Sequence, residues 1–98
     1  MPKALKVPRG CFAVKDWNKD VLIFDPRAPV RALDRVLIYC PDDLRIRIAG
    51  TYVPKGTAGD RGTIRIHVDH GHDAGDYHEF DRQLVAVAKI LRTTRDRR

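Results

Sequence analysis

Two segments in which apolar and charged residues alternate restrict the fold of this chain more than any other feature. Residues 44–50 read LRIRIAG, and residues 63–69 read TIRIHVD. Successive side chains of a β-strand point to opposite faces of a sheet, so each segment presents its aliphatic residues to one face and its arginines to the other. The pattern predicts two half-buried β-strands.

The other apolar runs of the chain are short and bounded by turn residues, which also favours strands. Residues 15–20 (KDWNKD) separate the first two runs and predict a tight polar connection. Residues 70–81 (HGHDAGDYHEFD) are predicted to form a polar loop. The further predicted strands are residues 12–14, 21–24, 35–40 and 83–93.

These patterns predict an all-β protein, built as a small twisted sheet or a partly open barrel. The 98 residues are 43% hydrophobic and contain no internal repeat, which indicates a single domain over residues 1–98. The net charge is +6, and part of the excess lies in basic tails at residues 1–9 and 93–98.

Several features bear on the cellular compartment. No uncharged stretch approaches the roughly 20 residues of a membrane-spanning helix, so no membrane partner is expected. Residues 1–10 lack the apolar segment of a secretory signal, and Cys11 and Cys40 are expected to stay reduced. These features indicate a cytoplasmic protein.

In the closing segment, residues 83–93, the stretch 84–91 is apolar on both alternating faces apart from Lys89. The spacing of its apolar residues also fits one face of a helix, but its Val and Ile content favours a strand. A sheet domain of this size has little mass to cover both faces, so we expect this strand to pair with a second copy or another protein. The residues predicted to bind that partner are Leu84, Val85, Val87, Lys89 and Leu91.

A positive patch is predicted from the charged faces of the two alternating strands. If the strands pair, Arg45, Arg47 and Arg65 come together. Such a patch is a solvated face, a docking surface for an acidic partner, or a site that follows a nucleic-acid backbone. Nucleic acid is not favoured, because only Trp17 and Tyr52 are available to stack on bases.

All four histidines lie within twelve residues, as His67, His70, His72 and His78. Imidazole nitrogens and the carboxylates nearby are typical zinc ligands, so a metal-dependent hydrolase that uses the 67–78 loop is one hypothesis. The spacing differs from the metallo-β-lactamase motif. The favoured interpretation is a polar loop, with no metal and no cofactor.

The order of these segments resembles the peptidase domain of the LexA, UmuD and phage CI repressor family. The resemblance covers residues 8–92 and is carried by GCFAV, DVLIFDPRAPVRALDRVLIY, DDLRIRI, GTIRIHVDHG and DYHEFDRQLVAVAKILRT. It implies the fold of the LexA C-terminal domain. It also implies dimerisation through the C-terminal strand region, which corresponds to residues 85–92 here.

The chain departs from this family at both catalytic positions. The family's nucleophilic serine belongs between Val14 and Asp20, but the chain contains no serine. The family's lysine base corresponds to Arg47, whose guanidinium stays protonated and cannot act as a base. We therefore expect a non-catalytic LexA-like domain that is not an enzyme.

The resemblance also implies a role in regulation. The ten residues ahead of Cys11 are too few for the DNA-binding helix-turn-helix that precedes the peptidase domain in this family. The expected function is protein binding, with a LexA- or CI-type repressor as candidate partner and a phage or mobile-element antirepressor as candidate role. A small basic β-module that binds nucleic acid is an alternative.

Overall fold

The computed structural model of the protein describes residues 7–16, 19–54, 62–69 and 74–94. Within these ranges the chain forms seven β-strands and no helix, which confirms the predicted all-β class. Accordingly, no described segment forms a helix long and apolar enough to cross a membrane. The strands are β1 (Phe12–Lys15), β2 (Val21–Asp25), β3 (Arg35–Cys40), β4 (Asp43–Tyr52), β5 (Thr63–Val68), β6 (Tyr77–Asp81) and β7 (Ala86–Thr94).

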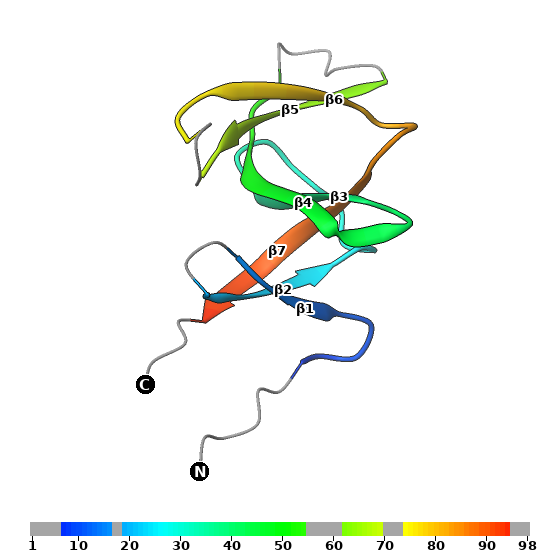
Figure 1. Ribbon diagram of the computed structural model, residues 1–98, viewed down its shortest axis with the longest axis vertical. Helices are drawn as coiled ribbons and strands as arrows, with labels where there is room; N and C mark the ends of the chain where they lie inside the picture. Colours follow the sequence, from blue (N-terminus) through cyan, green and yellow to red (C-terminus); the bar gives the residue numbers. More distant parts are fainter. Residues whose placement is uncertain (1–6, 17–18, 55–61, 70–73, 95–98) are drawn as a thin grey trace.

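One sheet contains all seven strands, in the order β1-β2-β7-β3-β4-β5-β6 (Figure 1). Every neighbouring pair of strands is antiparallel. The end strands β1 and β6 do not pair with each other, so the sheet is twisted but not closed into a barrel. The last strand in the sequence, β7, lies inside the sheet between β2 and β3.

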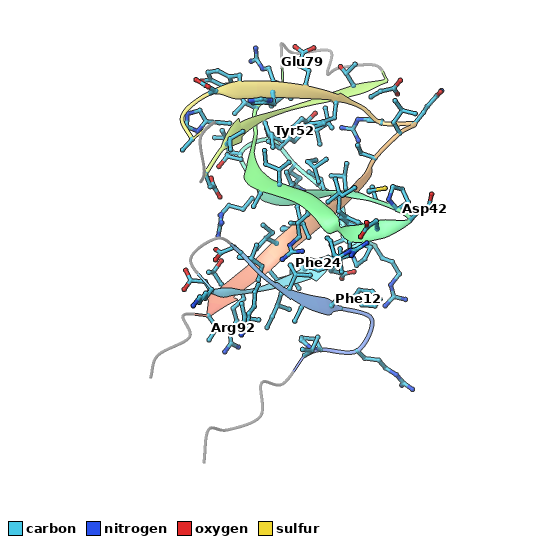
Figure 2. All side chains as sticks on the ribbon, in the orientation of Figure 1. Phe12, Phe24, Asp42, Tyr52, Glu79 and Arg92 are labelled. Atoms are coloured by element: carbon cyan, nitrogen blue, oxygen red, sulfur yellow. The ribbon has the colours of Figure 1, made fainter. Side chains whose placement is uncertain are left out.

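The sheet folds over both faces of its central strands and encloses two hydrophobic cores. In Figure 1 the β5–β6 hairpin lies above β3 and β4, and the β1–β2 hairpin lies below them. Figure 2 shows Tyr52 in the upper half and Phe24 in the lower half. The upper core contains the buried residues Val36, Ile38, Tyr52, Ile64, Ile66 and Val68, and the lower core contains Leu22, Phe24, Leu37, Ala88 and Ile90.

Strand β3 is therefore buried on both faces. Val36 and Ile38 belong to the upper core, and Leu37 between them belongs to the lower core. This arrangement follows from the alternation of side chains along a strand and from the apolar run VLIY, which has no polar face.

Gly50, within β4, is the position at which the upper half folds over. Strand β5 pairs with β4 at only three residues, 50–52. A Cβ atom at Gly50 would lie 2.5 Å from the backbone oxygen of His67 and 3.0 Å from Cδ1 of Ile66. Glycine therefore permits a close crossing of the β5 backbone over β4, as an isolated glycine in a strand often does.

The structure corrects the prediction that residues 70–81 form a loop. The last five of these residues form β6, an edge strand that pairs with β5. Tyr77 and Glu79 are exposed, whereas His78 and Phe80 alternate with them and are half-buried. The strand was missed because its one inward face carries a histidine and a phenylalanine instead of aliphatic residues.

The closing strand, which was predicted to pair with a second copy or another protein, has both edges paired within the sheet. β7 pairs with β2 along one edge and with β3 along the other. Ala88 and Ile90 enter the lower core, and Val87 packs against the upper core. The folded sheet itself thus covers both faces of β7. This strand extends to Thr94, so the predicted tail at 93–98 begins within it.

We expect Gly50→Ala to lower the free energy of unfolding by about 2–3 kcal/mol, because the added methyl group pushes the β5 backbone away from β4. Urea unfolding followed by circular dichroism measures the change. Gly75→Ala is the matched control, since Gly75 has open space at its Cβ position and only its φ of +88° opposes alanine. That conformation costs about 1 kcal/mol. Equal losses in the two variants would contradict the role given to Gly50.

Candidate functional site

The first half of β4 carries an open strand edge. β3 pairs with one side of β4 along most of its length. On the other side β5 pairs only with residues 50–52, and the carbonyl of Ala49 accepts a hydrogen bond from the backbone N–H of Asp69 (3.2 Å). In the described chain no strand pairs with the outer edge of residues 43–48. Such an edge presents backbone N–H and C=O groups to another chain.

An apolar groove of about 470 Å³ lies on one side of this edge, between β4 and the turn that connects β6 to β7. Ile46 and Leu84 line the groove and are 64% and 72% exposed, so two large aliphatic side chains of one apolar surface face solvent together. The groove is the open end of the upper core, since Ile38 also lines it. The other lining residues are Tyr39, Cys40, Arg47, Ile48, His78, Phe80 and Val85.

A cationic pocket of about 400 Å³ lies on the other side of β4, at the open end of the lower core. Its apolar lining includes Leu22 and Leu37, which belong to the lower core. Four cationic side chains and one carboxylate complete the charged lining, from Lys15, Lys19, Arg45, Arg47 and Asp16. This excess of positive charge suits a ligand that carries negative charge.

The β1–β2 turn brings two of these lysines to the pocket. The backbone N–H of Asp16 donates to the carbonyl of Asp20 (2.9 Å), and the N–H of Lys19 donates to the carbonyl of Asp16 (3.1 Å). Lys19 has a φ of 63°, which tightens the turn. The guanidinium of Arg47 donates to the carbonyl of Lys15 and so ties β4 to this turn.

Arg45 is held by its neighbour Asp43. The Nε of Arg45 lies 2.9 Å from Oδ1 of Asp43, and the backbone N–H of Arg45 donates to the same oxygen (3.0 Å). These hydrogen bonds lower the pKa of Asp43 below its ordinary value, the one from the guanidinium being the larger cause. The side chain of Arg45 is 89% exposed, so this pair adds little to stability, and its main effect is to orient the guanidinium.

Arg65 does not join Arg45 and Arg47 in one patch, contrary to the prediction from the sequence. The backbone N–H of Val53 donates to the carbonyl of Arg65, which places Arg65 about 20 Å along the strand from Arg47. The side chain of Arg65 donates to the carbonyl of Val53 (3.0 Å) and its guanidinium lies 5.2 Å from the ring centre of Tyr77. The predicted patch is therefore two separate sites.

The histidines do not gather around one point in the described chain. His78 pairs with Ile66, a fully buried core residue, and lines the apolar groove. His67 follows Ile66 and points to the opposite face of the β5–β6 hairpin, so these two histidines cannot bind one ion. No three His, Cys, Asp or Glu side chains of the described ranges form a metal-binding group. His70 and His72 lie outside those ranges.

The five residues predicted to bind a partner occupy different environments. Val85 and Val87 pack against the upper core, and Leu84 and Val85 line the apolar groove. Lys89 makes an ion pair within the chain. Leu91 is the extra residue of a β-bulge between β2 and β7 and is exposed away from the groove. Leu84 and Val85 are thus the two that belong to the candidate site.

Comparisons with protein families, with curated proteins and with solved structures found no match to this chain. What the site does must therefore be argued from its geometry. In that geometry an open strand edge separates an apolar groove from a cationic pocket.

Sequence reasoning missed Lys15, Lys19 and Ile46 as site residues. Ile46 was assigned to the buried face of its strand, but the covering hairpin leaves β4 before it reaches this residue. The signal that was available is Gly50, because an isolated glycine in a strand indicates a bulge or a close backbone approach.

We expect Val87→Asp to lower the free energy of unfolding by about 3 kcal/mol, because it puts a charge against the upper core. Leu91→Asp, in the same strand, is the matched control and changes it by less than about 1 kcal/mol, since Leu91 is exposed. Urea unfolding of both variants provides the measurement. Similar stabilities would mean that Val87 does not pack in the core.

The pH dependence of stability depends in part on Asp34. Its carboxylate accepts a hydrogen bond from the backbone N–H of Arg31 (2.8 Å) and lies 3.5 Å from Nζ of Lys89. Both interactions lower the pKa of Asp34 from its ordinary 3.8, the hydrogen bond from Arg31 being the larger cause. Because folding lowers the pKa of this carboxyl, the carboxylate stabilises the folded state at pH values above its ordinary pKa. This contribution is lost as the pH falls through the lowered pKa of the folded state.

We therefore expect the unfolding free energy of Asp34→Asn to fall less than that of the wild type when pH is lowered from about 5 to about 2. The amide keeps an oxygen that accepts the hydrogen bond from Arg31 but has no proton to bind. Urea unfolding at a series of pH values tests this, and parallel curves for the two proteins would show that Asp34 contributes nothing to the acid response.

Proposed function

We propose that this protein works by binding another protein through the open edge of β4, and not by catalysis. The observation that carries the proposal is the combination of an unpaired strand edge at residues 43–48 with an apolar groove beside it. An extended segment that joins such an edge gains main-chain hydrogen bonds, and its side chains gain specificity from pockets beside the edge. The exposed Ile46 and Leu84 would be covered in that complex.

The resemblance to the LexA, UmuD and CI peptidase domain supports a binding role. In that family a serine in a turn and a lysine on a nearby strand form the catalytic pair, and the matching positions here are the β1–β2 turn and Arg47. These two positions are in contact, because Arg47 donates a hydrogen bond to the carbonyl of Lys15. The contact supports a relation to the family. The residues at these positions differ from the catalytic serine and lysine, so the family's Ser–Lys reaction is not expected here.

The serine nucleophile and the lysine base of the family are both missing from the matching positions. The chain has no serine, and the described turn residues Lys15, Asp16, Lys19 and Asp20 carry no hydroxyl or thiol. An arginine at position 47 keeps its proton. The proposed role is therefore that of a non-catalytic regulator, which binds a repressor of the LexA or CI type as an antirepressor in a phage or mobile-element circuit.

The test is capture of partners from the source cell by the wild type and by Ile46→Asp, followed by identification of the captured proteins. Ile46 is exposed, so the variant is expected to fold, but its carboxylate faces the apolar groove. We expect a repressor-like protein to be retained at least tenfold more by the wild type. Leu91→Asp, at a leucine outside the groove, is expected to retain the protein as the wild type does.

The captured protein is then incubated with the wild type at alkaline pH, where a lysine base works best. We expect no cleavage product. Cleavage would contradict a non-catalytic role, and equal capture by the wild type and Ile46→Asp would contradict binding at the β4 edge.

A further inference from the structure

The two hollows beside β4 differ in chemistry and share one wall. Ile46 lines the apolar groove, whereas Arg45 lines the cationic pocket together with Lys15 and Lys19. Arg47 and Ile48 line both hollows. β4 separates the two hollows because its side chains alternate between its faces. The edge between them is the one that β5 leaves unpaired.

The backbone of β4 is oriented to accept another strand at this edge. The carbonyl of Ala49 and the backbone N–H of Val53 both form hydrogen bonds on the side of β4 that faces β5. In an antiparallel ladder alternate residues turn their N–H and C=O groups to the same edge, so the backbone groups of Arg45 and Arg47 also point to it. The N–H of Arg45 already donates to Oδ1 of Asp43, so an added strand takes the place of that hydrogen bond. Residues 43–48 extend about 20 Å, which is room for a segment of about six residues.

A strand added at this edge would place alternate side chains over the two faces of β4. One set of its side chains would lie beside Ile46 and the apolar groove. The other set would lie beside Arg45 and the cationic pocket. Complementary chemistry for these two faces is apolar on the first and negatively charged on the second.

We infer that the open edge of β4 binds an extended segment of a partner protein in which Asp or Glu residues alternate with apolar residues. This inference rests on the proposed function and specifies the partner's chemistry. The apolar side chains cover Ile46 and Leu84, and the carboxylates lie beside Arg45, Lys15 and Lys19.

A second copy of the chain does not fit this edge. Two β4 strands that pair antiparallel across a two-fold axis would set the Arg45–Arg47 face of one copy beside the same face of the other. Like charges opposite each other on neighbouring strands destabilise the pairing. The net charge of +6 adds to this repulsion, so an acidic segment is the complementary occupant.

The two faces contribute differently to binding. The guanidinium of Arg45 is exposed and already paired with Asp43, so a partner carboxylate there selects between partners more than it adds affinity. The apolar groove supplies most of the affinity, because Ile46 and Leu84 lose contact with water on binding. Loss of the groove contact is therefore expected to weaken the binding of every peptide. Loss of the positive charge is expected to weaken the binding of acidic peptides selectively.

The test uses three labelled heptapeptides with blocked ends, and fluorescence anisotropy at physiological ionic strength. The first alternates Glu with Val, the second has Lys in place of each Glu, and the third has the composition of the first with the glutamates and valines in two blocks. We expect the alternating acidic peptide to bind at least tenfold more tightly than either control. Amide chemical shifts in the ¹⁵N-labelled protein are expected to change at residues 44–48.

A variant with a reversed charge at position 45 tests whether the cationic pocket selects acidic partners. Arg45→Glu removes an exposed side chain that is outside both cores, and its fold is checked by its amide spectrum. We expect this variant to lose at least tenfold in affinity for the acidic peptide and to gain affinity for the lysine peptide. Ile46→Asp is expected to lower the affinity for both peptides.

Several outcomes overturn the inference. Equal binding of acidic and lysine peptides, both sensitive to Ile46→Asp, would leave binding at the edge intact and reject the acidic pattern. Absence of peptide binding, with the captured partner still sensitive to Ile46→Asp, would reject the pattern but not the proposed function. Binding of a labelled single-stranded oligonucleotide instead, steeply weakened by salt and lost in Arg45→Glu, would assign the cationic pocket to nucleic acid.

Discussion

The close crossing of β5 over β4 at Gly50 is the constraint on which the rest of the structure depends. The carbonyl oxygen of His67 occupies the space that a side chain at position 50 would need. β5 therefore leaves β4 after three paired residues, and the β5–β6 hairpin covers the upper core. The same divergence leaves the first half of β4 unpaired, so the burial of one core and the exposure of the candidate site have a common cause.

The strand content of the fold was largely readable from the sequence, but the pairing of the strands was not. The alternating segments at 44–50 and 63–69 coincide with most of β4 and β5, because alternation is a local property. β7 was placed at an interface, because apolar side chains on both faces fit an interface and a folded sheet equally well. The choice between them depends on contacts between distant parts of the chain, here those of β7 with β2 and β3.

The site was predictable only in part, for the same reason. Arg45 and Arg47 were identified from the charged face of their strand, but the short pairing of β4 with β5 separates them from Arg65. Lys15 and Lys19 reach the pocket from a hairpin at the other end of the sheet, and no pattern within their own segment indicates that. The exposure of Ile46 depends on where the covering hairpin diverges, which a single glycine determines.

The interior position of β7 has a consequence for how the protein folds. β2 and β3 are close in sequence, yet β7, the last of the seven strands to leave the ribosome, lies between them in the sheet. Until then the β1–β2 hairpin and the β3–β6 meander are two pieces with uncovered apolar faces, and the lower core lacks Ala88 and Ile90. Such long-range closure makes folding slow and leaves a nascent chain exposed to aggregation. Association of the two pieces is thus expected to be the step at which a chaperone has the most time to act.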